Sequence, residues 1–288
     1  MTFWARALFV PALTLFGLGA PAFAEESAPA AAEPTPAPAA APTPAPAAAP
    51  APAAAPAAAP AAKLTASEIL ARMEERNNGY ADQLMELTLT VVDSAGSRKS
   101  YDFTIHQKGD MKRLVEFTSG ELKGMSTLVE SASSVYVYLP GYKKVRRVAA
   151  ANMNQSLAGS DLSSEDMANV SWVKGWQVVL EKEDDSSWWL ALTPKAGQET
   201  DYAKVVHRVA KGHFSQQESH YYNRAGEKVK QFLNSELTDF GAGATRYKNV
   251  IVSDPRTGHR TELLVRTFKV NQGLSDKLFT VRQLQWGK

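Results

Sequence analysis

The chain of 288 residues carries 32 lysines and arginines against 30 aspartates and glutamates, and it has no cysteine. A charge this close to balance gives no reason to expect a nucleic-acid partner. Without cysteine the chain can form no disulfide and cannot be acylated as a lipoprotein itself, so its stability must come from a packed core.

Residues 1–24 have the features of a secretory signal peptide. They carry one charge, at Arg6, followed by the apolar run 7–18 and the small-x-small pattern Ala22-Phe-Ala24. The run is too short to span a bilayer, and Pro11 interrupts it. The sequence therefore predicts export to the periplasm, with cleavage after this pattern.

Residues 25–62 are almost entirely alanine and proline. Proline fixes φ and lacks the backbone donor that a helix needs, while alanine offers little surface to bury. We expect a disordered, extended tether that reaches on the order of 100 Å. The remaining residues, 63–288, are enough for one β-rich domain with a substantial core.

This domain is predicted to open with a helix at 66–78. Thr65-Ala-Ser-Glu68 is a capping-box pattern, and Ile69, Leu70 and Met73 supply an apolar face at helical spacing. Asn77-Asn-Gly79 then ends the helix.

Beyond the helix the apolar period becomes that of a strand. Apolar and polar residues alternate over 85–91 and 101–105, and short turns lead on to a third strand at 112–117, which predicts an antiparallel meander. Because the polar alternates must face water, the apolar face should be the concave side of the sheet. We expect that face to line an apolar cavity with Met85, Leu87, Leu89, Val91, Tyr101, Phe103 and Ile105.

The stretch 135–148 reads as an apolar and aromatic strand, a Pro-Gly turn and a basic return strand. Its cations have two interpretations: a solvated edge that discourages pairing between sheets, or a docking patch for an acidic partner or anionic lipid headgroups. Alternatively, one of its arginines pairs with Asp161 or Asp166 and clamps the following loop over the sheet. The four cations are Lys143, Lys144, Arg146 and Arg147.

Strand patterns continue to the end of the domain, and helix is expected only at 66–78, within 149–168 and near 275–277. Many strands at regular spacing, with helix scarce, predict a mainly β fold, either a large curved antiparallel sheet or an incomplete barrel. The later strands are expected at 176–180, 188–192, 205–209, 213–222, 228–237, 245–252 and 260–270.

The sequence contains none of the common motifs of catalytic residues. There is no Gly-x-Ser-x-Gly pattern, no cysteine nucleophile and no Walker-type phosphate loop. His207, His213 and His220 are six and seven positions apart on predicted strands, so we interpret them as surface or rim histidines rather than metal ligands. We therefore predict a protein that is not an enzyme and needs neither cofactor nor metal.

Several short motifs resemble the signature of bacterial LolA-like outer-membrane lipoprotein-sorting proteins. They are Tyr138-Leu-Pro140, Lys144-Val-Arg-Arg147, Gly159-Ser-Asp161 and Glu165-Asp166, with Gly124-Met-Ser-Thr-Leu128 before them and Leu278-Phe-Thr-Val281 near the end. The resemblance covers most of residues 63–288. It implies an incomplete barrel with helices closing its mouth and an apolar cavity that binds acyl chains.

From these observations we expect a periplasmic carrier that holds acyl chains of lipoproteins or lipids for transfer toward the outer membrane. An inner-membrane exporter complex would supply the cargo and an outer-membrane acceptor would receive it. Two alternatives remain, a non-catalytic scaffold of the cell envelope and an accessory partner of a membrane lipid exporter. An internal cavity too small for an acyl chain would favour the scaffold.

Overall fold

The computed structural model describes residues 63–131, 133–157, 159–169 and 171–286. The predicted signal peptide (1–24) and tether (25–62) lie outside the described residues. The helices are α1 (Ala66–Asn78), α2 (Ser164–Ala168), α3 (Trp172–Gly175) and α4 (Val281–Trp286), with 3-10 turns η1 (Gly120–Leu122), η2 (Pro140–Tyr142), η3 (Ala150–Asn152) and η4 (Asp276–Phe279).

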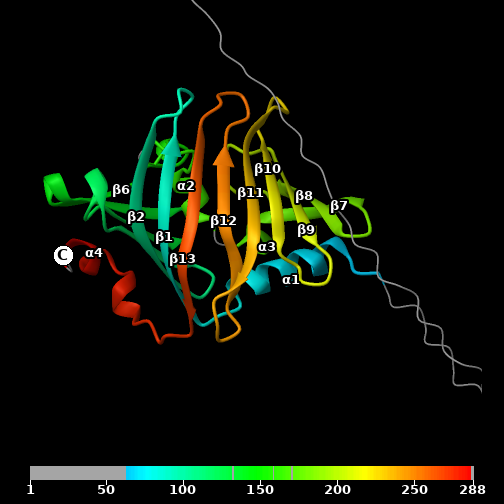
Figure 1. The fold of residues 1–288 in the computed structure, drawn as a ribbon, viewed down its shortest axis with the longest axis horizontal. Helices are drawn as coiled ribbons and strands as arrows, with labels where there is room; N and C mark the ends of the chain where they lie inside the picture. Colours follow the sequence, from blue (N-terminus) through cyan, green and yellow to red (C-terminus); the bar gives the residue numbers. More distant parts are fainter. Residues whose placement is uncertain (1–62, 132, 158, 170, 287–288) are drawn as a thin grey trace, which may run out of the picture. The chain divides into compact units, whose positions relative to one another are not determined.

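Strands dominate the described part of the chain and form one open antiparallel sheet of 13 strands, which confirms the predicted fold class (Figure 1). They are β1 (Asp82–Val92), β2 (Arg98–Lys108), β3 (Lys112–Phe117), β4 (Ser126–Ser131), β5 (Ser134–Leu139), β6 (Lys144–Arg147), β7 (Trp176–Glu183), β8 (Ser187–Pro194), β9 (Lys204–Ala210), β10 (Gln216–Tyr222), β11 (Lys228–Asp239), β12 (Thr245–Ser253) and β13 (Arg260–Val270).

The strand order explains why the sheet needs a long connection across it. The order is β6-β5-β4-β3-β2-β1-β13-β12-β11-β10-β9-β8-β7, so β1 and β13 pair in the middle while β6 and β7 form the two edges. The chain therefore leaves one edge after β6 and must cross to the opposite edge before β7. Residues 148–175, here named the crossing segment, make that crossing and contain η3, α2 and α3.

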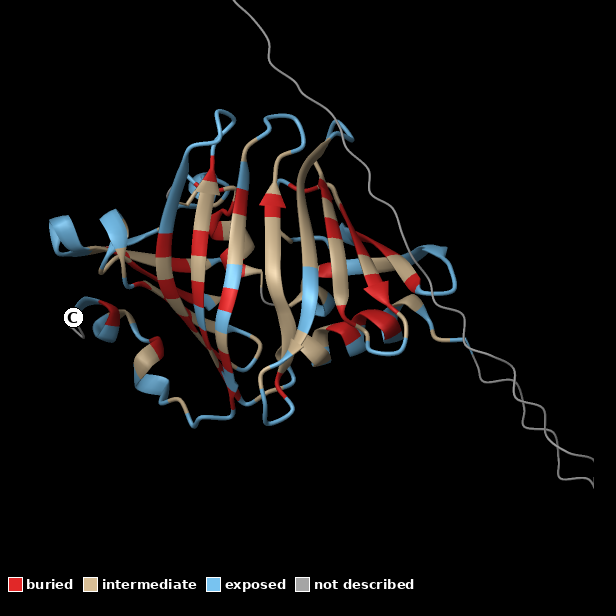
Figure 2. Ribbon diagram, viewed as in Figure 1, coloured by how far each residue is buried: buried red, intermediate tan, exposed pale blue. Residues whose placement is uncertain are grey.

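The central core is built from alternate residues of the middle strands. In the register of β1 and β2, Met85 lies opposite Ile105 and Leu87 opposite Phe103. Both pairs are buried, and Leu162 and Met167 of the crossing segment belong to the same apolar cluster. The buried bands run along the middle of these strands while the connecting loops are exposed (Figure 2). The crossing segment thus packs on the concave face that strand alternation predicts.

The core is extended by α1 and by the C-terminal elements η4 and α4. The capping box at Thr65 and Glu68 begins α1 as predicted, and this helix buries Ile69, Leu70 and Met73 against β7 to β10. At the other side of the sheet, Phe279 and Leu284 of η4 and α4 cover Leu114, Leu128 and Tyr138. Val115 faces the central cluster and its neighbour Leu114 faces this second one, so β3 is buried on both faces.

Candidate functional site

A cavity of about 270 Å³ lies between the sheet, the end of α1 and the crossing segment. Its apolar wall includes Met85, Leu87 and Ile105, three of the residues that the sequence predicts for an acyl cavity. The other four lie elsewhere: Leu89, Tyr101 and Phe103 are buried in the adjoining core cluster, and Val91 is half-buried against it.

A second cavity of about 830 Å³ lies on the other side of α2. It is more polar and is lined by η3, α3 and residues 197–201. Glu165 and Asn169 line both cavities. The short helix α2 is therefore the partition between two adjacent hollows.

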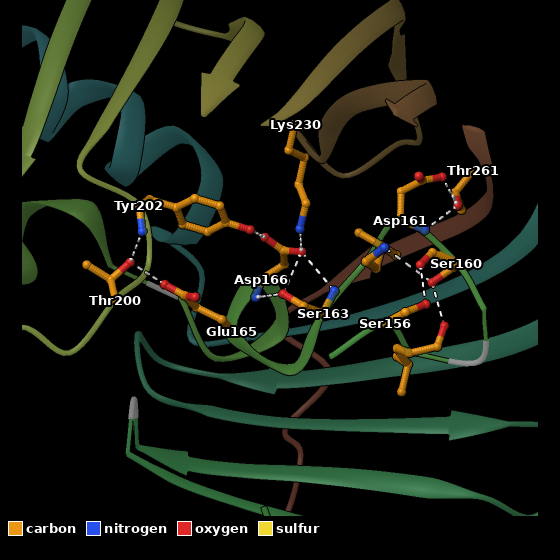
Figure 3. A network of polar contacts seen from close by, with 12 residues as sticks. Ser156, Ser160, Asp161, Ser163, Glu165, Asp166, Thr200, Tyr202, Lys230 and Thr261 are labelled. Atoms are coloured by element: carbon orange, nitrogen blue, oxygen red, sulfur yellow. Dashed lines mark hydrogen bonds and ion pairs between the residues drawn. The ribbon is translucent and has the colours of Figure 1, made fainter. Parts of the chain in front are cut away.

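Gly159-Ser-Asp161 anchors the crossing segment to the middle of the sheet. Gly159 has a φ of 75°, which a glycine adopts without strain. Next to it, the Asp161 carboxylate accepts from Thr261 Oγ1 at 2.8 Å and lies 2.9 Å from His259 Nδ1, while its backbone N–H donates to Thr261 Oγ1 (Figure 3). Because the Asp161 side chain is 8% exposed, these bonds form largely away from water.

Asp166 anchors the same segment to β11. Its carboxylate accepts from the backbone N–H and the hydroxyl of Ser163, which closes a capping box at the start of α2. Lys230 Nζ donates to the same oxygen at 2.6 Å, and the side chains of Asp166 and Lys230 are 5% and 12% exposed. Figure 3 shows Asp166 between Lys230, Tyr202 and Ser163. A buried ion pair of this kind is costly to break from one side.

The structure corrects the predicted partners of these two acids. Arg146 and Arg147 do not reach Asp161 or Asp166, which pair with His259, Thr261 and Lys230 instead. The reason is topological, because β6 is an edge strand whereas Asp161 and Asp166 lie over β11 and β13. Sequence spacing suggested nearness to the arginines, but the crossing segment carries the acids away from them.

Glu165 is the third acid of α2, and its environment differs from that of its neighbours. Its carboxylate accepts from the Thr200 hydroxyl. Burial raises the pKa of Glu165 to about 7, and the nearby charges of Asp166 and Asp201 act in the same direction. A carboxyl group that changes charge near neutral pH therefore sits in the partition between the two cavities.

The predicted basic patch lies on β6 and the turn before it. All four of its side chains, Lys143, Lys144, Arg146 and Arg147, are exposed, and Tyr142 beside them is 70% exposed. Val145 between them is half-buried against the cluster under α4. Arg147 also donates to the carbonyl of Ser133 at 3.0 Å. The patch is thus an accessible edge with one arginine tied to the fold.

Sequence reasoning missed the arginines of the first cavity. Arg76, Arg113 and Arg246 all line it, and Arg113 shares a face of β3 with the buried Val115 and Phe117. The alternation of this strand could have identified Arg113, because a cation on the same face as core residues must have a specific role or partner.

The expectation for His207 was wrong. Its side chain is fully buried, with Nδ1 2.8 Å from Ser219 Oγ and the ring 4.4 Å from that of Trp172. Burial lowers the pKa of His207 to about 3, so the ring is neutral. The strand β9 is buried on both faces, since Val206 is buried as well as Val205 and Val209, so the place of β9 in the sheet and not the residue type accounts for the burial of His207.

Among the described residues, no helix combines the length and apolar character that crossing a bilayer requires. No curated protein matches the sequence. A family model described as "-like: Uncharacterized protein" matches residues 109–286.

Three solved structures share the fold. A DUF1329 family protein from Desulfovibrio piger is 25% identical and has a TM-score of 0.71, over 76% of this chain and 97% of that one. A domain from Vibrio parahaemolyticus, described as an outer membrane lipoprotein-sorting protein, is 19% identical with a TM-score of 0.70, over 76% and 98%. A LolA superfamily protein from Nitrosomonas europaea is 19% identical with a TM-score of 0.65, over 76% and 99%.

These likenesses agree with the motifs at 124–166 and with the open sheet. Since the family model covers more than half of the chain, the chain belongs to the family of this model, and its fold is that of the LolA-like outer-membrane lipoprotein-sorting proteins.

Proposed function

We propose that this protein is a carrier that holds acyl chains of lipoproteins or lipids on the concave face of its sheet. The observation that carries this proposal is the cavity between the sheet and the crossing segment, whose apolar wall is continuous with the central core. A concave, mostly pre-formed site with an apolar wall and a few polar groups is the usual form of a small-ligand site. Such a carrier needs no covalent chemistry, so we propose that it is not an enzyme.

The crossing segment gives the site a means of adapting to cargo. Leu162 and Met167 fill space on the concave face, while the second cavity of about 830 Å³ begins on the other side of α2. Outward movement of α2 would join the two hollows and release apolar surface for a chain. The first cavity alone, about 270 Å³, is just below the usual size of a ligand site, and joined to the second hollow of about 830 Å³ it would exceed the lower limit of that range.

We further propose that the carrier works in the periplasm and moves its cargo toward the outer membrane. The signal peptide expected at 1–24 supports export, the tether expected at 25–62 would precede the lipid-binding domain at 63–288, and the fold is shared with lipoprotein-sorting proteins. An inner-membrane exporter complex and an outer-membrane acceptor would be its partners. The exposed cations of β6 offer a surface for docking to an acidic partner or an anionic membrane.

Native mass spectrometry of the protein purified from its host, together with uptake of a fluorescent fatty acid, tests the carrier. We expect co-purifying lipid or lipopeptide, and saturable uptake at one site per chain. Repeated absence of any bound lipid together with no uptake would reject the carrier and favour the scaffold.

A further inference from the structure

On the concave face of β1, β2 and β3, a row of apolar side chains lies next to a row of polar side chains that ends in an arginine. At one level Met85 lies opposite Ile105, which lies opposite Val115. Two residues away along each strand, and on the same face, Gln83 lies opposite Gln107, which lies opposite Arg113. Side chains two residues apart on a strand point to the same face. The cavity wall is therefore amphipathic along the strand direction.

The two buried glutamines of this polar row accept hydrogen bonds from two arginines. Arg113 donates to Gln107 Oε1 at 2.7 and 3.2 Å, and Arg246 donates to Gln83 Oε1 at 3.0 Å. The amide nitrogens of Gln83 and Gln107 donate in turn to the end of α1, at Asn77 O and Asn78 Oδ1. This repeated arrangement orients both guanidinium groups, with Arg246 also stacked over the Phe268 ring.

Neither guanidinium has a counter-charge in the described part of the chain. No carboxylate there forms an ion pair with Arg113 or Arg246, although both side chains line the cavity. Burial lowers the pKa of each to about 10, and repulsion by Arg246 contributes at Arg113. Both groups still carry their charge at neutral pH. Desolvated cations without anions are costly unless a bound group compensates them.

The acidic side chains that line the cavity make their contacts with groups other than Arg113 and Arg246. Glu74 accepts from the hydroxyl of Ser171 and from the backbone N–H groups of Trp172 and Val173 at the start of α3. Asp166 is paired with Lys230, and Glu165 is partly protonated at neutral pH. Arg76 adds a third cation to the lining and donates to Thr245 Oγ1. The cavity thus has an excess of fixed positive charge beside an apolar wall.

We infer that the cargo of this cavity is an anionic amphiphile, whose carboxylate or phosphate headgroup binds Arg113 and Arg246 while its acyl chain lies along Met85, Leu87 and Ile105. The inference rests on the proposed carrier function and narrows its cargo. Guanidinium groups match the geometry of carboxylate and phosphate oxygens, and a bidentate pair is strongest away from water. A neutral ester, amide or alcohol would leave both cations uncompensated.

Calorimetric titration with three probes of equal chain length tests the headgroup. Dodecanoate and dodecyl phosphate carry the anion and dodecan-1-ol lacks it, each used below its aggregation limit at pH 7.5. We expect at least one of the two anionic probes to bind at least tenfold more tightly than the alcohol. Acetate and inorganic phosphate serve as chain-free anions, and we expect neither to displace dodecanoate at tenfold molar excess.

Arg246→Gln, Arg246→Lys and Arg266→Gln form a matched set, because Arg266 is 55% exposed and pairs with Asp102 outside the cavity. We expect Arg246→Gln to weaken dodecanoate binding about tenfold without changing dodecanol binding. Arg246→Lys should retain most of the preference, and Arg266→Gln should retain all of it. Circular dichroism confirms that each variant is folded before its titration is used.

The outcomes separate the two proposals. Equal affinity for acid, phosphate and alcohol, or an equal loss of acid and alcohol binding in Arg246→Gln, overturns the anionic headgroup but leaves the carrier standing. Displacement of dodecanoate by acetate or inorganic phosphate would mean a site for small anions and also overturns the inference. No binding of any probe also overturns the anionic headgroup, whereas the carrier itself is rejected only by absence of co-purifying lipid together with no fatty-acid uptake.

Discussion

Glu165 and Asp166 are neighbours in the chain, yet their surroundings give them different chemistry. Asp166 has a lysine and a capping box, which satisfy its charge inside the protein. Glu165 has a hydroxyl donor and two nearby acids, so burial decides its protonation. One residue can therefore hold α2 in place while the other makes that hold depend on pH.

The raised pKa of Glu165 predicts a pH dependence of stability. Its pKa rises from an ordinary 4.5 to about 7 on folding, so the folded state binds the proton more tightly than the unfolded chain does. The stabilisation is complete below about pH 4.5 and is lost as the pH rises through 7. We expect Glu165→Gln to remove this slope, which amounts to at most about 1.4 kcal/mol per pH unit.

Urea unfolding of wild type and Glu165→Gln between pH 5 and pH 8 measures this difference. The two proteins should be similar at pH 5, and the variant should be the more stable one at pH 8. Glu199→Gln is the matched control, since Glu199 lines the same second cavity but is exposed. A constant stability difference across the range would show that Glu165 is ionised throughout.

At the scale of elements, strand alternation was the most reliable guide. It gave the meander of β1 to β3 and the two strands predicted within 135–148, which the structure places at 134–139 and 144–147, while capping and helical spacing placed the first helix at its observed bounds. These features follow from local periodicity and capping, which the sequence displays directly. The regular strand spacing allowed either a curved open sheet or an incomplete barrel, and the family motifs then indicated the incomplete barrel with closing helices.

The site was harder to predict, because its parts come from distant strands. The pairing of Asp166 with Lys230 and of Asp161 with Thr261 depends on where the crossing segment lies over the sheet. Nothing in the residues near Asp161 or Asp166 indicates β11 or β13. Gln83, Gln107 and Arg113 likewise come together only through the register of three strands. The alternation within β3, however, already places Arg113 on the face of buried apolar residues, which is unusual for a cation.

The basic edge formed by β6 yields a second prediction. We expect the variant with all four cations changed to glutamine to lose less than about 1 kcal/mol of stability, because exposed charges contribute little and Val145 keeps the strand packed. Association with vesicles of anionic phospholipid should weaken, and wild-type binding should fall with salt since screening acts within about 10 Å at 0.1 M. Melting temperature and vesicle sedimentation measure the two effects.

A control with the same change of charge tests whether the position of the cations matters. Glutamine replaces four exposed lysines that lie on other elements, and this variant should bind vesicles nearly as well as wild type. Unchanged vesicle binding in the β6 variant would exclude this edge as the docking surface. The control lysines are Lys99, Lys123, Lys269 and Lys277.

At the scale of the whole described domain, the topology links both edges of the sheet to the cavity through one segment. The chain must cross from β6 to β7, and the crossing segment brings Leu162 and Met167 onto the concave face. Its anchors at Asp161 and Asp166 attach it to β13 and β11. An acyl chain bound against Met85 and Ile105, as we propose, would therefore be covered by the same segment that connects the two halves of the sheet.

This arrangement predicts that cargo uptake requires the segment to move, and a disulfide between Asp161→Cys and Thr261→Cys should prevent it. The two side chains are in hydrogen-bond contact and the natural chain has no cysteine, so the added pair can form only one bridge. We expect the oxidised protein to take up fluorescent fatty acid at least tenfold more slowly than the same protein after reduction. Ser156→Cys with Ser163→Cys is the control, because that pair bridges two points within the segment and leaves its contact with the sheet free. Stopped-flow uptake before and after reductant compares one protein with itself, so any effect of losing Asp161 cancels. Equal rates in the two states of the Asp161–Thr261 variant would show that the acyl chain reaches the cavity without displacing this anchor.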